Sequence, residues 1–580
     1  MEVYKKIFHY VPTKKYLTIV AILLSFLSAI FLTASYYILY KFLYKLIINN
    51  NTNEAKLYGY TIILLLFSAS ALYILSALFT HIVAFRLETN LRKKGIEGLS
   101  EAGFSFFDFN SSGKIRKIID DNTEQTHMIV AHLIPDNASA LISPIALITV
   151  AFLIDIKIGL ILMILSLIAF YLMTLMSGNK EFMVLYQEAL EKMSSETVEY
   201  IRGIQVIKIF NSTIYSFKNL YEAIMSYSKY ALNYSLSCRI PFCLFQIIFL
   251  GIIAILLPFT VFFTKEANSK LYLIKLIMIL FLSGALFTSF MKIMYVQMHA
   301  FLGASAINKL ENIFDEMLKE KISFGNKEKF KNFDIKFEDV SFAYTDKYVL
   351  KNLSFELKEK KTYALIGKSG SGKSTIVKLI SGFYKASSGK IKIAGENIQN
   401  YSEKAIMKNI AFVFQNSKLF KKSIYENVKI GNPDATKEEV LEAMKLAGCD
   451  NILNKFKDRE NTEIGTKGVY LSGGEKQRIT IARAILKNAQ IIILDEASAA
   501  VDSENEYLVQ QAFANLIKDK TVIIIAHRIS TVKNVDEILV VEDGKIVERG
   551  NHSELISQNG KYRYFQELYK NANEWRLRHE

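Results

Sequence analysis

Long apolar stretches dominate the first half of the chain. Before about residue 305 they recur at lengths that can cross a hydrocarbon layer, which takes roughly 20 apolar residues. After residue 334, short apolar runs alternate with charged residues and Gly-containing turns, as in an α/β domain outside a membrane. The third span is the weakest, because His132, Asp136 and Asn137 interrupt it, and an alternative start lies near Ala138. The six predicted spans are about 17–40, 57–80, 129–154, 156–177, 240–264 and 271–298.

The segments between spans two and three and between spans four and five are long and basic. Positive charge collects on the cytosolic side of membrane proteins, so both segments are predicted to face the cytosol. Their apolar residues continue at helical spacing, as in Thr197, Tyr200 and Ile204, which predicts helices that project beyond the membrane. Lysines also precede the first span, which lacks a small-residue cleavage site and is therefore predicted to be retained. The cations of the two segments are Arg86, Arg92, Lys93, Lys94, Lys114, Arg116 and Lys117, then Arg202, Lys208, Lys218, Lys229 and Arg239.

A phosphate-binding loop follows the apolar run Tyr363–Ile366 and precedes the apolar run Ile376–Ile380. Its pattern is G-x-x-x-x-G-K-[ST], in which glycines let backbone N–H groups close on phosphates. Lys373 is expected to reach the β- and γ-phosphate oxygens, and the Ser374 hydroxyl is expected to ligate Mg²⁺. The sequence therefore predicts a nucleoside triphosphate site formed by Gly367, Lys368, Ser369, Gly370, Ser371, Gly372, Lys373, Ser374 and Thr375.

Composition bounds the whole chain. With 580 residues it is too long for one core, and we predict a transmembrane domain at 1–320, a charged linker at 321–333 and a nucleotide-binding domain at 334–580. The net charge of +15 does not indicate a nucleic-acid partner, because the cations follow the membrane pattern and form no basic stripe with interleaved aromatics. The three cysteines, Cys238, Cys243 and Cys449, have neither zinc-site nor disulfide spacing and are interpreted as structural.

Four further motifs lie downstream of the phosphate loop. They are Gln415 after Phe412-Val-Phe, the run Leu471-Ser-Gly-Gly-Glu475, the apolar strand that ends in Asp495 and Glu496, and His527 after Val522-Ile-Ile-Ile-Ala. In this order the motifs resemble the ATP-binding cassette (ABC) transporter family, whose signature motif is much more specific than any phosphate loop. The resemblance implies a multidomain membrane protein, with an all-α six-helix transmembrane domain followed by an α/β P-loop nucleotide-binding domain.

The resemblance also implies a role for each motif residue. Glu496 is the expected general base, with His527 contacting the γ-phosphate and Gln415 sensing the membrane domain. Asp495 joins Ser374 and Gln415 as the expected Mg²⁺ set. Tyr344, in Val340-Ser-Phe-Ala-Tyr344, is expected to stack on adenine, although a strand Tyr packed in the core is the alternative. The remaining nucleotide-binding residues are predicted to be Leu471, Ser472, Gly473, Gly474, Glu475 and Asp502.

The same resemblance extends to the long loops and to assembly. Phe106-Phe-Asp108 and Gly203 with Val206-Ile-Lys208 resemble the intracellular loops of the exporter-type (type IV) fold. Their tips, expected near Phe109–Ile115 and Ile209–Tyr215, are coupling helices in that family. The family's signature loop completes the site of a second domain, so a chain with one motif set must pair with a copy of itself or with a paralogous half-transporter.

Three functions stay open at this point. The first is an ATP-hydrolysing half-transporter that exports a small molecule, lipid or peptide from a cell membrane, with its nucleotide-binding domain in the cytosol. The second is an importer of a siderophore-like ligand on the same fold, which the variant run Ser498-Ala-Ala-Val-Asp502 faintly resembles. The third is an ATP-gated regulator. Gln246, Lys292, Gln297 and His299 can line a substrate cavity among the lipid-embedded spans, but Lys292 can equally snorkel to the interface.

Overall fold

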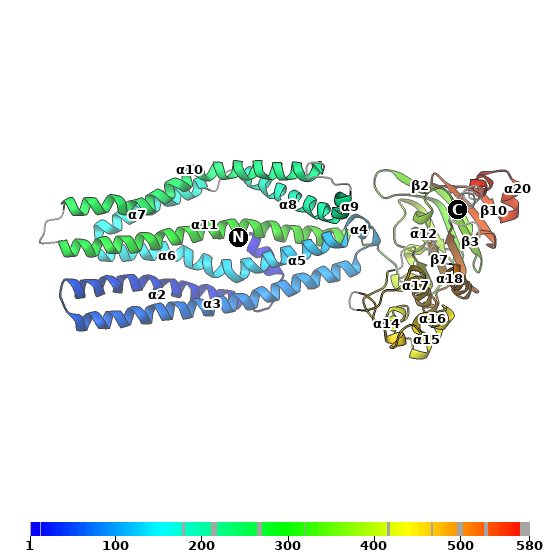
Figure 1. The fold of residues 1–580 in the computed structure, drawn as a ribbon, viewed down its shortest axis with the longest axis horizontal. Coiled ribbons are helices and arrows are strands. Elements are labelled where there is room, and N and C mark those ends of the chain that lie inside the picture. The colour runs from blue at the N-terminus through cyan, green and yellow to red at the C-terminus, as the bar shows by residue number, and fades with distance from the viewer. Residues whose placement is uncertain are drawn as a thin grey trace. The chain divides into compact units, whose positions relative to one another are not determined.

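The chain forms two compact units, which are drawn in Figure 1. The first consists of Met1–Ser100 and Ser111–Glu316, and the second of Glu101–Asn110 and Met317–Glu580. The second unit is therefore discontinuous in sequence. The computed structural model describes residues 2–11, 13–176, 180–209, 217–263, 269–319, 321–414, 418–465, 468–495, 503–526 and 532–568.

The first unit is entirely helical in its described residues. Six of its helices are long and apolar enough to cross a membrane, as predicted, and the chain is a multi-pass membrane protein. Several exceed the membrane thickness: α3, with 50 residues, is about 75 Å long, so the loops predicted to project are continuations of the spans. The elements are α1 (Glu2–His9), α2 (Tyr16–Ile47), α3 (Thr52–Glu101), α5 (Ser112–Met128), the π-helical turn η1 (Ile129–Leu133), α6 (Ile134–Ile154), α7 (Ile156–Met176), α8 (Lys180–Arg202), α9 (Ile204–Ile209), α10 (Lys218–Phe263) and α11 (Ser269–Lys319).

Hydroxyl side chains hold the spans together around an irregular stretch of the third one. Pro135 has no N–H, so the carbonyl of Ala131, four residues earlier, loses its helical donor. The Thr80 hydroxyl of α3 donates to that carbonyl at 2.8 Å, and the Ser25 hydroxyl of α2 donates to the Pro135 carbonyl at 2.7 Å. The helix thus runs on through Asp136 rather than starting near Ala138.

The second unit contains two sheets. The main sheet has the order β10-β9-β3-β8-β7-β6, and its strands β9, β3, β8, β7 and β6 pair in parallel. Its central strands are apolar and buried, as strands covered on both faces must be. A four-stranded antiparallel sheet has the order β2-β1-β4-β5. The strands are β1 (Ile335–Ala343), β2 (Tyr348–Leu357), β3 (Thr362–Ile366), β4 (Ser388–Ile393), β5 (Glu396–Asn397), β6 (Ile410–Val413), β7 (Ile491–Asp495), β8 (Thr521–Ile525), β9 (Glu537–Glu542) and β10 (Lys545–Gly550).

Helices surround these sheets, and several begin with a reciprocal cap. Ser423, Thr436, Ser472 and Asn551 each form a capping box with a Glu three residues later. The predicted fold class is confirmed by this α/β unit and the six-helix unit together. The helices are α4 (Phe104–Phe109), α12 (Lys373–Ile380), η3 (Ile398–Asn400), α13 (Glu403–Asn409), α14 (Ile424–Lys429), α15 (Lys437–Leu446), α16 (Asp450–Leu453), η4 (Arg459–Asn461), α17 (Gly473–Lys487), α18 (Ser503–Ile517) and α20 (His552–Ser557).

The first loop tip differs from its predicted position. The first short helix is α4, which lies before the predicted 109–115, because Asn110 is extended and the Ser111 hydroxyl caps a new helix from Ser112. At the second tip, α9 ends at Ile209, and residues 210–215 lie outside the described ranges.

The predicted linker is bound to the second unit. Phe324, Phe330 and Phe333 pack against the core, and Phe330 stacks on Tyr401 with ring centres 4.0 Å apart. The Gly325 N–H donates to the Tyr401 carbonyl at 3.0 Å. These contacts fix the charged segment 321–333 to the second unit, so it is not a free linker.

Candidate nucleotide site

The phosphate loop lies between β3 and α12, as predicted. Gly370 and Gly372 adopt left-handed backbone angles, with φ of 80° and 107°, which side chains rarely tolerate. A Cβ on Gly372 would come within 2.8 Å of the Leu350 side chain, whereas a Cβ on Gly370 would meet nothing within 4 Å. The loop is therefore tightly packed at Gly372, whereas space is free beside Gly370. The loop leads into the N-terminus of α12, where free backbone N–H groups favour the binding of an anion.

Lys373 is folded against the loop that it serves. Its ammonium donates to the carbonyls of Gly367 and Lys368 at 2.9 and 2.8 Å. Burial lowers the pKa of Lys373, while the charge of Asp495, at the end of β7, acts to raise it. The structure thus brings together the predicted phosphate-binding cation and a predicted metal-binding carboxylate.

Oxygen ligands suited to Mg²⁺ lie around this pair. Ser374 is exposed on the first turn of α12, and Asp495 is half-buried. The buried Ser371 hydroxyl lacks a hydrogen-bond partner, so the loop retains unused polar capacity. Hydroxyl and carboxylate oxygens are the donors that Mg²⁺ prefers, and the residues present fit a magnesium nucleotide.

The other predicted catalytic residues follow strands that end at the same sheet edge. Leu365 of β3 pairs with Ile525 of β8, Ile525 pairs with Asp495 of β7, and Leu494 pairs with Val413 of β6. The carboxyl ends of parallel strands form the ligand-binding edge of such sheets. Gln415, Glu496, Asp502 and His527 come shortly after these strands but lie outside the described residues.

Tyr344 lies just beyond β1, next to the loop helix. Its hydroxyl is 3.2 Å from the Thr375 hydroxyl, and its ring meets the ring of Tyr384 edge-on, with centres 5.3 Å apart. The Tyr344 side chain is only partly buried. Tyr344 thus packs against the core and also borders the phosphate loop. Its stacking on adenine stays a prediction, because these contacts are compatible with both roles.

The signature motif begins a helix whose first residues face outward. Ser472 and Gly473 are exposed, whereas Leu471, Gly474 and Glu475 are buried. Glu475 accepts the Ser472 N–H at 2.7 Å and the Lys455 ammonium at 2.6 Å. Burial acts to raise the pKa of Glu475, but these donors outweigh it and the pKa is lowered. Glu475 fixes the helix end, and Ser472 and Gly473 remain available to a ligand.

The partners of the first loop were not predicted from the sequence. Phe104 of α4 stacks on Phe383 with ring centres 3.7 Å apart. Asp108 lies 3.2 Å from the Lys378 ammonium of α12 and also accepts the Tyr384 hydroxyl. Since Tyr384 contacts Tyr344, α4 touches the surroundings of the nucleotide site. The motif Phe106-Phe-Asp108 was a signal for a docking helix but not for its partners.

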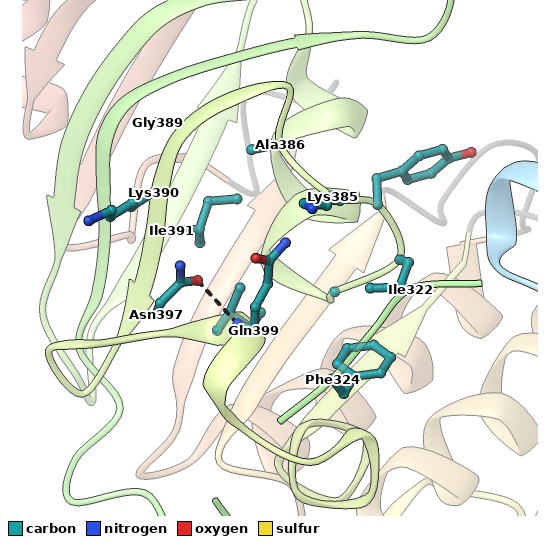
Figure 2. Close-up of a pocket in the computed structure, with 12 residues that line it drawn as sticks. Ile322, Phe324, Lys385, Ala386, Gly389, Lys390, Ile391, Asn397 and Gln399 are labelled. Atoms are coloured by element: carbon teal, nitrogen blue, oxygen red, sulfur yellow. Dashed lines mark hydrogen bonds between the residues drawn. The ribbon is translucent and has the colours of Figure 1, made fainter. Parts of the chain in front are cut away.

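A separate cavity of about 70 Å³ lies beside the bound linker. Figure 2 shows Ile322 and Phe324 together with Lys390, and the Asn397 side chain accepting the Gln399 N–H at 3.1 Å. None of the residues that line the cavity belongs to the phosphate loop, so the cavity is no part of the phosphate site.

These features define a class of protein: a multi-pass membrane unit joined in one chain to a P-loop nucleotide-binding unit. Residues 18–311 match the model of the ABC transporter transmembrane region, and residues 350–499 match the ABC transporter model. The chain belongs to the ABC transporter family, and this membership implies ATP binding.

Two relatives and one solved structure illustrate the similarity. The mycobactin import ATP-binding/permease protein IrtA of Mycolicibacterium smegmatis is 31% identical over 87% of this chain and 58% of its own length. The ATP-dependent lipid A-core flippase of Aliivibrio fischeri is 47% identical over 40% of each chain. The chain thus spans less than two thirds of these relatives. A bacterial Atm1-family ABC exporter with ATP bound shares the fold, with a TM-score of 0.73, 23% identity, and coverage of 95% of this chain and 97% of that one.

Proposed function

We propose that this chain is half of an ATP-driven transporter and that it exports a small molecule, lipid or peptide by alternating access. The observation that carries the proposal is Lys373 beside Asp495 at the carboxyl edge of the sheet, in a chain that also has six membrane-spanning helices. Phosphoryl transfer depends mainly on positioning and charge, which this edge supplies.

The chain's own residues have separate tasks. Lys373 would leave the loop carbonyls for the β- and γ-phosphates, and Ser374 and Asp495 would hold Mg²⁺. The metal, when bound, neutralises charge on the phosphate oxygens. Glu496, one residue beyond Asp495, would orient and deprotonate the attacking water. Gln415 would help to hold Mg²⁺ and sense the membrane domain, and His527 would contact the γ-phosphate.

A second half-transporter completes the proposed site. Ser472 and Gly473 are exposed at a helix N-terminus, where a phosphate of a facing subunit would bind. The loop helix α4, through Phe104 and Asp108, would carry the closing motion of the nucleotide-binding units to the spans. The partner is a second copy or a paralogous chain.

Vesicle transport tests this function and its direction. The purified chain, alone and with any paralogous partner, is reconstituted with its nucleotide-binding units outside, and candidate solutes are followed with and without Mg-ATP. Export predicts accumulation inside these inverted vesicles. Import, which the name of the mycobactin relative suggests as the second candidate, predicts loss from preloaded ones. ATP-dependent gating without uphill movement would favour a regulator instead.

A further inference from the structure

Two ion pairs link α11 to the third span, about one membrane thickness apart. Lys275 pairs with Asp155, and Lys292 pairs with Asp136. The lysines are 17 residues apart and the aspartates 19, which along a helix is about 26 and 29 Å. The hydrocarbon core is about 30 Å thick. The pairs therefore lie near its two edges, and the basic loops place the Lys292 pair at the cytosolic edge.

The two pairs differ in exposure. The Lys275 side chain is 25% exposed, whereas that of Lys292 is 51% exposed and its ammonium lies at a longer 3.4 Å from Asp136. Asp136 also accepts the Tyr73 hydroxyl at 2.8 Å, and the Lys292 ammonium lies 5.7 Å from the Tyr73 ring centre. Asp136 would thus keep its hydrogen bond from Tyr73 if the Lys292 ammonium bound another anion.

The backbone next to Asp136 is irregular. The π-helical turn η1 and Pro135 directly precede it, and Thr80 compensates for the lost helical hydrogen bond. A Cβ on Gly303 of α11 would come within 1.5 Å of Ile129 in that turn. Inserted π turns occur frequently at functional sites. Ile129 of this turn packs against Gly303 of α11, which lies 11 residues beyond Lys292 along that helix.

An uncharged stripe runs along α11 from Lys292 toward the outer edge. Thr288, Gly284 and Phe281 follow at helical spacing, all exposed, with Phe281 at 51%. A Cβ on Gly284 would meet nothing within 4 Å, so space is open beside the stripe. One cation at the cytosolic edge is thus followed by an apolar, open helix face.

We infer that Tyr73, Asp136 and Lys292 form the head-group site for an anionic amphiphile, whose tail lies along Thr288, Gly284 and Phe281. The anion replaces Asp136 at the Lys292 ammonium while Tyr73 retains Asp136. This inference rests on the proposed transport function and names its substrate class: molecules with an apolar chain and a phosphate or carboxylate head.

Binding to the full chain in zwitterionic nanodiscs tests the inference, with dodecyl phosphate, dodecylphosphocholine and methyl phosphate as probes. We expect wild type to bind dodecyl phosphate at least about tenfold more tightly than either other probe, Lys292→Gln to lose this preference, and Lys292→Arg to retain it. Lys275→Gln, the matched control on the same helix, should also retain it. Asp136→Asn should bind dodecyl phosphate more tightly, because it removes a competing anion.

Equal binding of both dodecyl probes by wild type would overturn the inference without any variant. Persistence of the preference in Lys292→Gln would overturn it as well. Methyl phosphate binding as tightly as dodecyl phosphate would indicate a free-anion site and refute the amphiphile. Wild-type ATPase activity, measured in the same nanodiscs, separates the two proposals. Its absence contradicts the transporter, whereas its presence without head-group preference contradicts only this site.

Discussion

Lys373 is the residue whose position ties the phosphate loop to the sheet edge. We predict that Lys373→Ala weakens ATP binding about 10- to 100-fold, since hydrogen bonds to charged groups contribute roughly 1.5–3 kcal/mol. Titration of the purified protein with a fluorescent ATP analogue measures this. Lys385→Ala is the matched control, because Lys385 is an exposed lysine of the same unit that lines the linker cavity. Unchanged affinity in Lys373→Ala would contradict the phosphate cradle.

Glu496 carries the second prediction at this scale. Glu496→Gln should bind ATP normally but lose hydrolysis by roughly 10²- to 10⁴-fold, because an amide keeps the shape of the carboxylate and cannot act as a base. The variant should also trap paired nucleotide-binding units with ATP, which size-exclusion chromatography in detergent detects. Turnover close to the wild-type value would refute the general-base assignment.

Single residues were predictable where the chemistry is local in sequence. The glycines and Lys373 fall within nine consecutive residues, so their spacing specifies the loop. Cys449, interpreted as structural, is buried, and burial raises the pKa of its thiol to about 12, which suppresses thiolate chemistry. The pairing of Asp136 with Lys292 was not predictable, because 156 residues separate the two and no local pattern relates them.

At the scale of elements, α4 is the part of the first long loop that belongs to the nucleotide-binding unit. We predict that Asp108→Asn and Lys378→Gln each lower substrate-stimulated ATPase activity more than basal activity, because both break the contact that α4 makes with α12. A double-mutant cycle should give a coupling energy of about 0.2–1 kcal/mol, the range for exposed pairs. Additive effects of the two substitutions would show that the Asp108–Lys378 ion pair does not contribute to the stimulation of ATPase activity by substrate.

The elements themselves followed from pattern, but their ends did not. The long apolar runs predicted all six spans. The short helix of the first loop was predicted too far along the chain, because the break at Asn110 and Ser111 depends on a local cap rather than on periodicity. The π-helical turn η1 had no sequence signal, because Thr80, which stabilises it, belongs to another helix. The linker seemed polar from its charges, although its phenylalanines bind the core.

At the scale of the whole molecule, ATP can shift the spans only by the difference in its affinity for the closed and open arrangements. We predict that spin labels on the cytosolic ends of the spans move together when Mg-ATP is added to Glu496→Gln. Label distances between the two halves, measured by pulsed electron resonance with and without Mg-ATP, check this. Unchanged distances with ATP demonstrably bound would contradict alternating access and favour a regulator.

The discontinuous nucleotide-binding unit has a consequence for biosynthesis. Phe104 is made about 280 residues before Phe383 and Tyr384, the neighbours that α4 contacts. At about 5–20 residues per second, α4 must wait ~15–55 s after synthesis for the surface that covers it. A nascent chain stalled within this interval presents Phe104 without its native cover, and an exposed apolar side chain of this kind is what chaperones bind.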